Sequence, residues 1–217
     1  MARKRYGRTV GKGLAGAVLA LVAYAGLQYD AMLREMDRAA ALYGQGNLEE
    51  ALRAYEDVES RLRARGTMRL IPSSDRQTLL LNQARLLYAL SRYDEAVDRL
   101  QREDDISGVA TDGRFFLLRG NITFRRALQE YRKPSTTPVV TPGGLAESLN
   151  LLREGLFSAG NSYRESLQIN PNDWDAKYDY EYVEKMQKDL AGSVEENIKV
   201  LQEELPPTEA LPPEQVG

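Results

Sequence analysis

The hydrophobic residues between positions 32 and 65 recur at helical spacing on both sides of a short polar break at 44–47. The residues that share a face are Met32, Met36, Ala39, Ala40 and Tyr43 before the break, and Leu48, Ala51, Leu52, Tyr55 and Val58 after it. This spacing is typical of amphipathic helices, and the two glycines in the break suit a tight turn. We therefore predict a helical hairpin, which needs a neighbour of the same shape to bury its apolar faces.

The same pattern recurs twice further along the chain. The second copy comprises Ala84, Leu87, Tyr93, Ala96, Val97 and Leu100, and the third comprises Gly120, Ala159, Tyr163, Leu167 and Pro171. The third copy has a long insertion between its two helices. The recurrence predicts an all-α fold of stacked helical hairpins over residues 30–192, with an irregular helical bundle as the alternative.

A small residue precedes an aromatic one by four positions in the second helix of two of these hairpins. The pairs are Ala51 with Tyr55 and Ala159 with Tyr163, and Pro171 follows the second pair. Small residues let helix axes approach closely, and the aromatic ring fills the space between hairpins. The pattern resembles the tetratricopeptide repeat (TPR), which implies a short TPR-like solenoid whose first helices line an inner groove.

Two segments are rich in proline. Residues 133–144 contain three prolines and two glycines, and we predict that they form an exposed insertion loop, followed by one long helix over 145–170. Residues 193–217 form an acidic, proline-rich C-terminal tail. We interpret this tail as a spacer in preference to a linear docking motif.

Aromatic and apolar residues lie four apart in the helix predicted before the tail. They are Trp174, Tyr178, Tyr182 and Met186. We interpret this helix as one that seals the open end of the stack, in preference to a ligand site.

The N-terminal 29 residues combine a basic segment with an apolar one. Residues 1–12 hold five of the 29 basic side chains and none of the 32 acidic ones, and residues 13–27 lack any charged or strongly polar side chain. Extended to Tyr29, the apolar stretch approaches the roughly 20 residues that cross a bilayer as a helix. The positive-inside rule then predicts a cytoplasmic segment at 1–12, a transmembrane helix at 13–29 and a periplasmic helical domain, in a single-pass protein of a bacterial inner membrane.

A cleavable signal peptide is the alternative for this segment. Ala23-Tyr24-Ala25 has the small-x-small form of a cleavage site. We favour a retained anchor because residues 30–36 continue directly into the first hairpin, with no spacer rich in proline or serine. An amphipathic helix on the membrane surface is excluded, because residues 13–27 have no polar face.

The composition argues against catalysis. The chain has no cysteine and no histidine, which excludes disulfides, thiolate chemistry and the commonest general base and metal ligand. No potential nucleophile has a recognisable activating base, so we expect no enzymatic activity, cofactor or metal. A basic head on an acidic body also argues against nucleic acid as a partner.

The repeat geometry supplies candidate binding residues. First-helix side chains line the inner groove of TPR proteins, and some members hold a peptide carboxylate there with Asn, Lys or Arg. Aligned on Ala84 and Gly120, the corresponding residues are Asn82, Arg85, Tyr88, Arg114, Asn121 and Arg125. We predict a partly basic groove for an acidic or extended protein segment, and ordinary solvated positions are an equally consistent interpretation.

Two further motifs extend the resemblance. They are Gly120-Asn121-Ile122-Thr123-Phe124, and the series Tyr163, Arg164, Leu167, Asn170, Pro171, Asp173, Ala176 and Tyr178. With the N-terminal helix, this arrangement is similar to proteins encoded beside MoxR-type AAA+ ATPases and von Willebrand A-domain proteins, including the MxaK-like accessory proteins of methanol dehydrogenase maturation.

This resemblance implies an adaptor that helps assemble, or insert metal into, a periplasmic enzyme. Its expected partners are other proteins, namely the ATPase and the von Willebrand A-domain protein. An envelope-structural subunit and a translocon- or chaperone-associated periplasmic TPR protein are the alternatives.

Overall fold

The computed structural model describes residues 3–101, 111–132 and 142–192. These residues form seven α-helices and one short 3-10 helix, with no strand among them, so the predicted all-α class is confirmed. The predicted tail at 193–217 and residues 133–141 of the predicted insertion loop lie outside the described residues.

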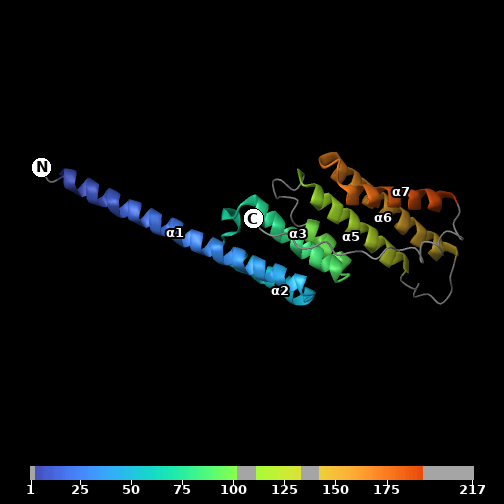
Figure 1. Cartoon of the computed structure of the whole chain (residues 1–217), viewed down its shortest axis with the longest axis horizontal. Coiled ribbons are helices and arrows are strands. Elements are labelled where there is room, and N and C mark those ends of the chain that lie inside the picture. Colours follow the sequence, from blue (N-terminus) through green and yellow to red (C-terminus); the bar gives the residue numbers. More distant parts are fainter. Residues whose placement is uncertain (1–2, 102–110, 133–141, 193–217) are drawn as a thin grey trace.

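Each helix packs against the next one along the chain, and α3 also contacts α5 (Figure 1). The elements are α1 (Arg3–Gly44), α2 (Leu48–Ala64), η1 (Met68–Leu70), α3 (Ser73–Ala89), α4 (Tyr93–Gln101), α5 (Gly113–Arg132), α6 (Pro142–Ile169) and α7 (Trp174–Gly192). Short connections therefore join α1 to α2, α3 to α4 and α6 to α7, as the hydrophobic pattern predicts.

Three of the helix ends share one hydrogen-bonding pattern. After α2, the amide of Gly66 donates to the carbonyl of Arg63 and the amide of Thr67 to that of Leu62, both at 3.0 Å. This is the Schellman motif, whose turning residue adopts a left-handed conformation. Gly46 (φ 81°) after α1 and Gly66 (φ 65°) fit it without strain, whereas Ser91 (φ 59°) after α3 carries a side chain in that region.

The buried side chains form two clusters. The first cluster contains residues of α1, α2, α3, α4 and the first half of α5. The second contains residues of α5, α6 and α7. The small residues picked out by the sequence pattern lie at the helix contacts and are fully buried: Ala51, Ala84, Ala96 and Ala159 are each 0% exposed. Tyr55 and Tyr163 are each 1% exposed, and one lies in each cluster.

The α5–α6 contact depends on glycine. A Cβ added at Gly120 would lie 2.4 Å from the Tyr163 ring, and one at Gly155 would lie 2.2 Å from the Cβ of Ala127. Because these distances are far below van der Waals contact, any larger residue at either position would force the two helices apart.

The N-terminal part of α1 projects away from the other helices (Figure 1). The described part of this helix from Gly16 onward is long and apolar enough to cross a membrane, and only 6% of its most apolar stretch is buried. Leu19, Leu21 and Leu27 are each about 70% exposed. From Met32 onward the same helix turns its apolar face into the core, with Met36 and Ala39 almost fully buried. One unbroken helix thus joins the apolar segment to the helical domain.

One predicted boundary is wrong. The insertion loop was expected to reach residue 144, but α6 begins at Pro142. Proline suits the first turn of a helix, because the amide that it lacks has no partner there, so the Pro-Gly-Gly sequence opens the helix instead of preventing it.

Candidate functional site

Asn82 lies in the packed interior instead of on an open surface. It is 2% exposed, and its side-chain amide donates a hydrogen bond of 3.1 Å to the Tyr55 hydroxyl. Burial raises the pKa of Tyr55 to about 12, so the hydroxyl stays protonated at neutral pH. The expected place of Asn82 in a groove is therefore wrong, because Tyr55 of the preceding hairpin covers it.

Arg85, one turn further along α3, is 7% exposed. Burial raises the pKa of Tyr43 and of Tyr55, and the charge of Arg85 partly offsets this rise in both. Arg85 is therefore near both tyrosines. Of the α3 candidates, Tyr88 is partly exposed. Its ring lies 5.8 Å from that of Tyr93 on α4.

Two further candidates, Asn121 and Arg125 of α5, lie near the hydroxyl of Tyr163, as does Tyr88. This hydroxyl donates a hydrogen bond of 2.8 Å to the amide oxygen of Asn121. Burial, together with nearby Asp179 and Tyr88, raises the pKa of Tyr163 well above its ordinary value, and Arg125 acts in the opposite direction. Asn121 thus contacts this hydroxyl, and Tyr88, Arg125 and Asp179, from α3, α5 and α7, are near enough to affect its pKa. We call these four residues the polar row.

Asp179 is the titratable member of the polar row. Burial and the neighbouring carboxylates of Asp175 and Asp173 raise its pKa to about 6, although Arg125 partly offsets these effects. Asp179 is not among the binding residues predicted from the sequence. Its raised pKa could have been expected, because Asp175 and Asp179 are four apart on one helix and like charges at that spacing repel.

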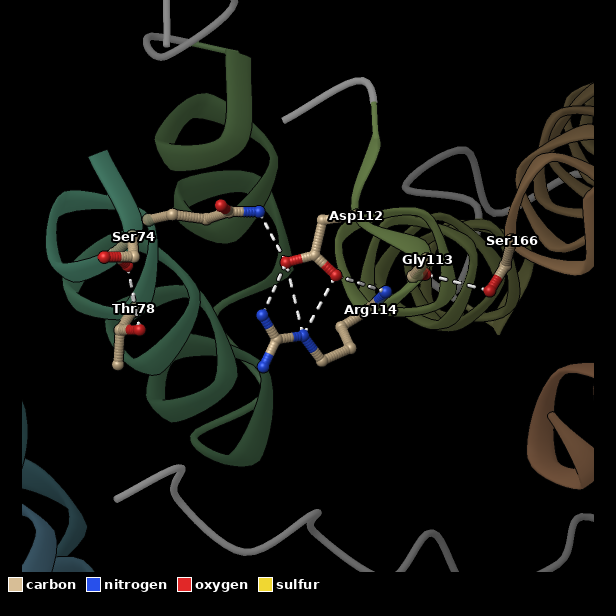
Figure 2. Close-up of polar contacts among 7 residues, drawn as sticks. Ser74, Thr78, Asp112, Gly113, Arg114 and Ser166 are labelled. Carbon is tan, nitrogen blue, oxygen red and sulfur yellow. Dashed lines mark hydrogen bonds and ion pairs between the residues drawn. The ribbon is translucent and has the colours of Figure 1, made fainter. Parts of the chain in front are cut away.

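Arg114 lies apart from the polar row, at the first turn of α5, and Asp112 binds it there (Figure 2). Its Nε donates to Oδ1 of Asp112 at 2.9 Å and its terminal nitrogen donates to Oδ2 at 2.8 Å, while Asp112 also accepts from the Arg114 amide at 2.9 Å. Burial opposes ionisation of Asp112, but these hydrogen bonds outweigh it and lower the pKa of Asp112.

The contacts of Asp112 and its neighbour position the start of α5. Gln77 of α3 donates to Oδ2 of Asp112 at 2.5 Å, and Ser166 of α6 donates to the carbonyl of Gly113 at 2.8 Å (Figure 2). Asp112 thus joins α3 to α5 and caps α5, so Arg114 has a structural role at this junction.

Exposed aromatic rings lie beside the polar row on α7. Trp174 is 77% and Tyr178 61% exposed, whereas Met186 is 2% exposed. The Tyr178 and Tyr182 rings stack with centroids 6.4 Å apart, and the Lys177 amine lies 4.6 Å from the Trp174 ring centroid. α7 packs against α6 and buries Val183, Met186 and Leu190, whereas its first two turns present aromatic surface.

A second polar cluster lies between α2, α3 and α4. Glu59 accepts hydrogen bonds from Arg63, Arg99 and Gln83. Burial opposes the ionisation of Glu59, but the two arginines outweigh it, so the pKa of Glu59 is lowered. A pocket of about 630 Å³ borders this cluster. Because Glu59 and Arg99 are almost buried and bound to each other, the cluster joins helices instead of offering a site.

The described residues contain no group of three or more acidic, histidine or cysteine side chains placed to hold a metal ion. Comparison of the chain with protein-family models, with curated proteins and with solved structures gave no match. The polar row therefore rests on its own geometry as the candidate site.

Proposed function

We propose that this protein is a membrane-anchored scaffold whose TPR-like helical domain binds other proteins in the periplasm. The observation that carries the proposal is the continuity of α1. Its exposed apolar part is suited to a bilayer, and its C-terminal part is built into the core of the helical domain. A rigid helix of this kind holds a binding domain at a set position next to the membrane.

The polar row is the proposed docking surface. Asn121 and Arg125 offer an amide and a guanidinium group, which bind carboxylates and the backbone of an extended segment. Tyr178 and Trp174 add exposed aromatic surface on the neighbouring helix, and aromatic residues are enriched where proteins bind one another. The proposed ligand is an extended, acidic protein segment.

The finer assignment rests on the sequence resemblance. In this assignment the protein is an adaptor for a MoxR-type AAA+ ATPase and a von Willebrand A-domain protein in the maturation of a periplasmic enzyme. Residues 1–12 lie in the cytoplasm and the helical domain lies in the periplasm of a bacterial inner membrane.

Co-purification of the full chain from detergent-solubilised native membranes tests the proposal. The chain should bring down the ATPase and the von Willebrand A-domain protein, and recovery of secretion machinery would favour the translocon-associated alternative. An Arg125→Ala variant should lose most of the captured partner, because it removes the cation of the polar row.

The matched control is Arg126→Ala. This neighbouring arginine pairs with Asp94 of α4 at 2.7 Å and is not part of the polar row. Arg126→Ala should retain the partner. If a folded Arg125→Ala protein retains all of the captured partner, the polar row is excluded as the docking surface. Turnover of a small substrate by the purified chain would contradict the scaffold proposal itself.

A further inference from the structure

The connection between α2 and α3, residues 65–72, has a defined shape. Gly66 closes the Schellman motif after α2, and the amide of Leu70 donates to the carbonyl of Thr67 at 2.9 Å within η1. Ile71 is 8% exposed and packs into the core, whereas Leu70, next to it, is 79% exposed. The buried Ile71 thus fixes this turn, and the turn exposes the apolar side chain of Leu70.

This connection lies beside the end of the apolar segment of α1. Arg65 donates a hydrogen bond to the side-chain oxygen of Gln28, and the hydroxyl of Tyr29 donates one of 2.5 Å to Asp75 at the start of α3. Both α1 residues end the segment expected to cross the membrane. Figure 1 shows the α2–α3 connection at the end of the helical domain from which α1 projects.

The charge of this region is opposite to that of the rest of the helical domain. Residues 60–72 contain four arginines and no acidic residue, in a chain whose pI is about 5.3. Arg61 and Arg63 are paired with Glu35 and Glu59. Neither Arg65 nor Arg69 forms an ion pair with a residue that the structure describes, and both are exposed. Two exposed cations, neither ion-paired within the described residues, thus lie in the same connection as the exposed Leu70.

We propose that the α2–α3 connection is a second membrane contact, in which Leu70 enters the interfacial region of the bilayer and Arg65 and Arg69 bind anionic lipid headgroups. An exposed apolar side chain together with cations on one connection is the chemistry that suits the boundary between headgroups and acyl chains. The proposal rests on the proposed membrane anchor. With two contacts at different points, the domain has a fixed orientation on the membrane instead of rotating about α1.

The full chain reconstituted in lipid nanodiscs tests this contact. Because the chain has no cysteine, a single environment-sensitive fluorophore can be attached at Leu70→Cys. Its emission should shift to the blue and lose most of its intensity when nitroxide-labelled lipid is present. The same label at Gln45→Cys, in the exposed turn between α1 and α2, should keep its intensity.

A third label separates this proposal from the anchor itself. Leu21→Cys lies in the apolar part of α1, so its label should be quenched whenever α1 is in the bilayer. Quenching at 21 and 70 supports the contact. Quenching at 21 with an unquenched label at 70 overturns the contact and leaves the anchor standing, and no quenching at 21 overturns both.

The two arginines are tested with the lipid composition. In nanodiscs that contain phosphatidylglycerol, quenching of the label at 70 should exceed that in pure phosphatidylcholine. Arg65→Gln with Arg69→Gln should abolish this difference. The control pair Arg38→Gln with Arg53→Gln removes the same charge from exposed positions near the end of α1 and the start of α2, and should preserve the difference between the two lipids. If the label at 70 is quenched equally in both lipids while Arg65 and Arg69 are present, the proposed role of the arginines is overturned.

Discussion

Each half of the helical domain buries one tyrosine that is bonded to an asparagine, but the surroundings of the two tyrosines differ. Tyr55 and Tyr163 are both 1% exposed, and each forms a hydrogen bond with an asparagine of a first helix. In the N-terminal half, Asn82 and Arg85 are buried with the ring. In the C-terminal half, Asn121 and Arg125 are partly exposed and Asp179 lies close by. A tyrosine bonded to an asparagine thus belongs to a closed polar core in one half and to a candidate binding surface in the other.

The two halves also differ in the contacts that hold their helices together. The N-terminal half uses a buried ion pair between Glu59 of α2 and Arg99 of α4. The C-terminal half uses close approach of α5 and α6 at Gly120 and Gly155. The first half should therefore respond most to a change of charge, and the second half to a change of volume.

The largest expected effect is in the N-terminal half. Glu59→Gln leaves the Arg99 guanidinium almost buried without its counter-charge, and breaking such a pair costs about 3 kcal/mol of unfolding free energy. Denaturant unfolding measures it. The control is Glu35→Gln, which removes the exposed ion pair between Glu35 of α1 and Arg61 of α2 and should cost less than about 1 kcal/mol. Equal losses of unfolding free energy in the two variants would contradict the larger contribution expected of the Glu59–Arg99 pair.

Gly120→Ala is the corresponding test in the C-terminal half. Its Cβ would overlap the Tyr163 ring, and overpacking of this kind costs about 1–3 kcal/mol, more than alanine gains in helix propensity. The same unfolding experiment applies. Gly44→Ala, where a Cβ meets nothing within 4 Å, serves as the control and should be nearly neutral. A Gly120→Ala protein as stable as the parent would mean that α5 and α6 do not approach as described.

A pH change should act on the two halves in opposite directions. Asp179 has a folded-state pKa of about 6, above the ordinary value of 3.8, so its contribution to stability increases as the pH falls through 6 towards 4. Glu59 has a lowered pKa, so its contribution is present above about 4.5 and is lost as the pH falls through its folded-state pKa.

Asp179→Asn isolates the first of these effects. The variant should be more stable than the parent by roughly 1 kcal/mol at pH 7.5, after allowance for solvent screening, and the difference should vanish below pH 4. Unfolding at a series of pH values measures it. A difference that stays constant with pH would show that Asp179 does not titrate near 6.

The smallest expected effect concerns the turn between α3 and α4. Ser91 holds a left-handed conformation that glycine adopts without strain, so Ser91→Gly should increase the unfolding free energy by about 0.5–1 kcal/mol. Gly66→Ala, at a similar backbone conformation, should produce the opposite sign. A loss of stability in Ser91→Gly would mean that the Ser91 side chain contributes more than the strain costs.

The helices and much of the core could be predicted from the sequence because the apolar spacing is a local property. Ala51, Ala84 and Gly120 were found at helix contacts for that reason. The surroundings of the site residues depend on other segments. Asn82 is covered by Tyr55 of another hairpin, and Arg114 is bound by Asp112 of a connecting segment. A helical pattern read one helix at a time does not contain those contacts.

The most direct test of the central claim is the accessibility of single cysteines in intact bacterial cells. In the function that we propose, α1 crosses the inner membrane and the helical domain lies in the periplasm. A maleimide that does not cross the inner membrane should label Gln45→Cys in spheroplasts and should label Ala2→Cys only after lysis. Labelling of Ala2→Cys alone, or recovery of the chain outside the membrane fraction, would contradict the account.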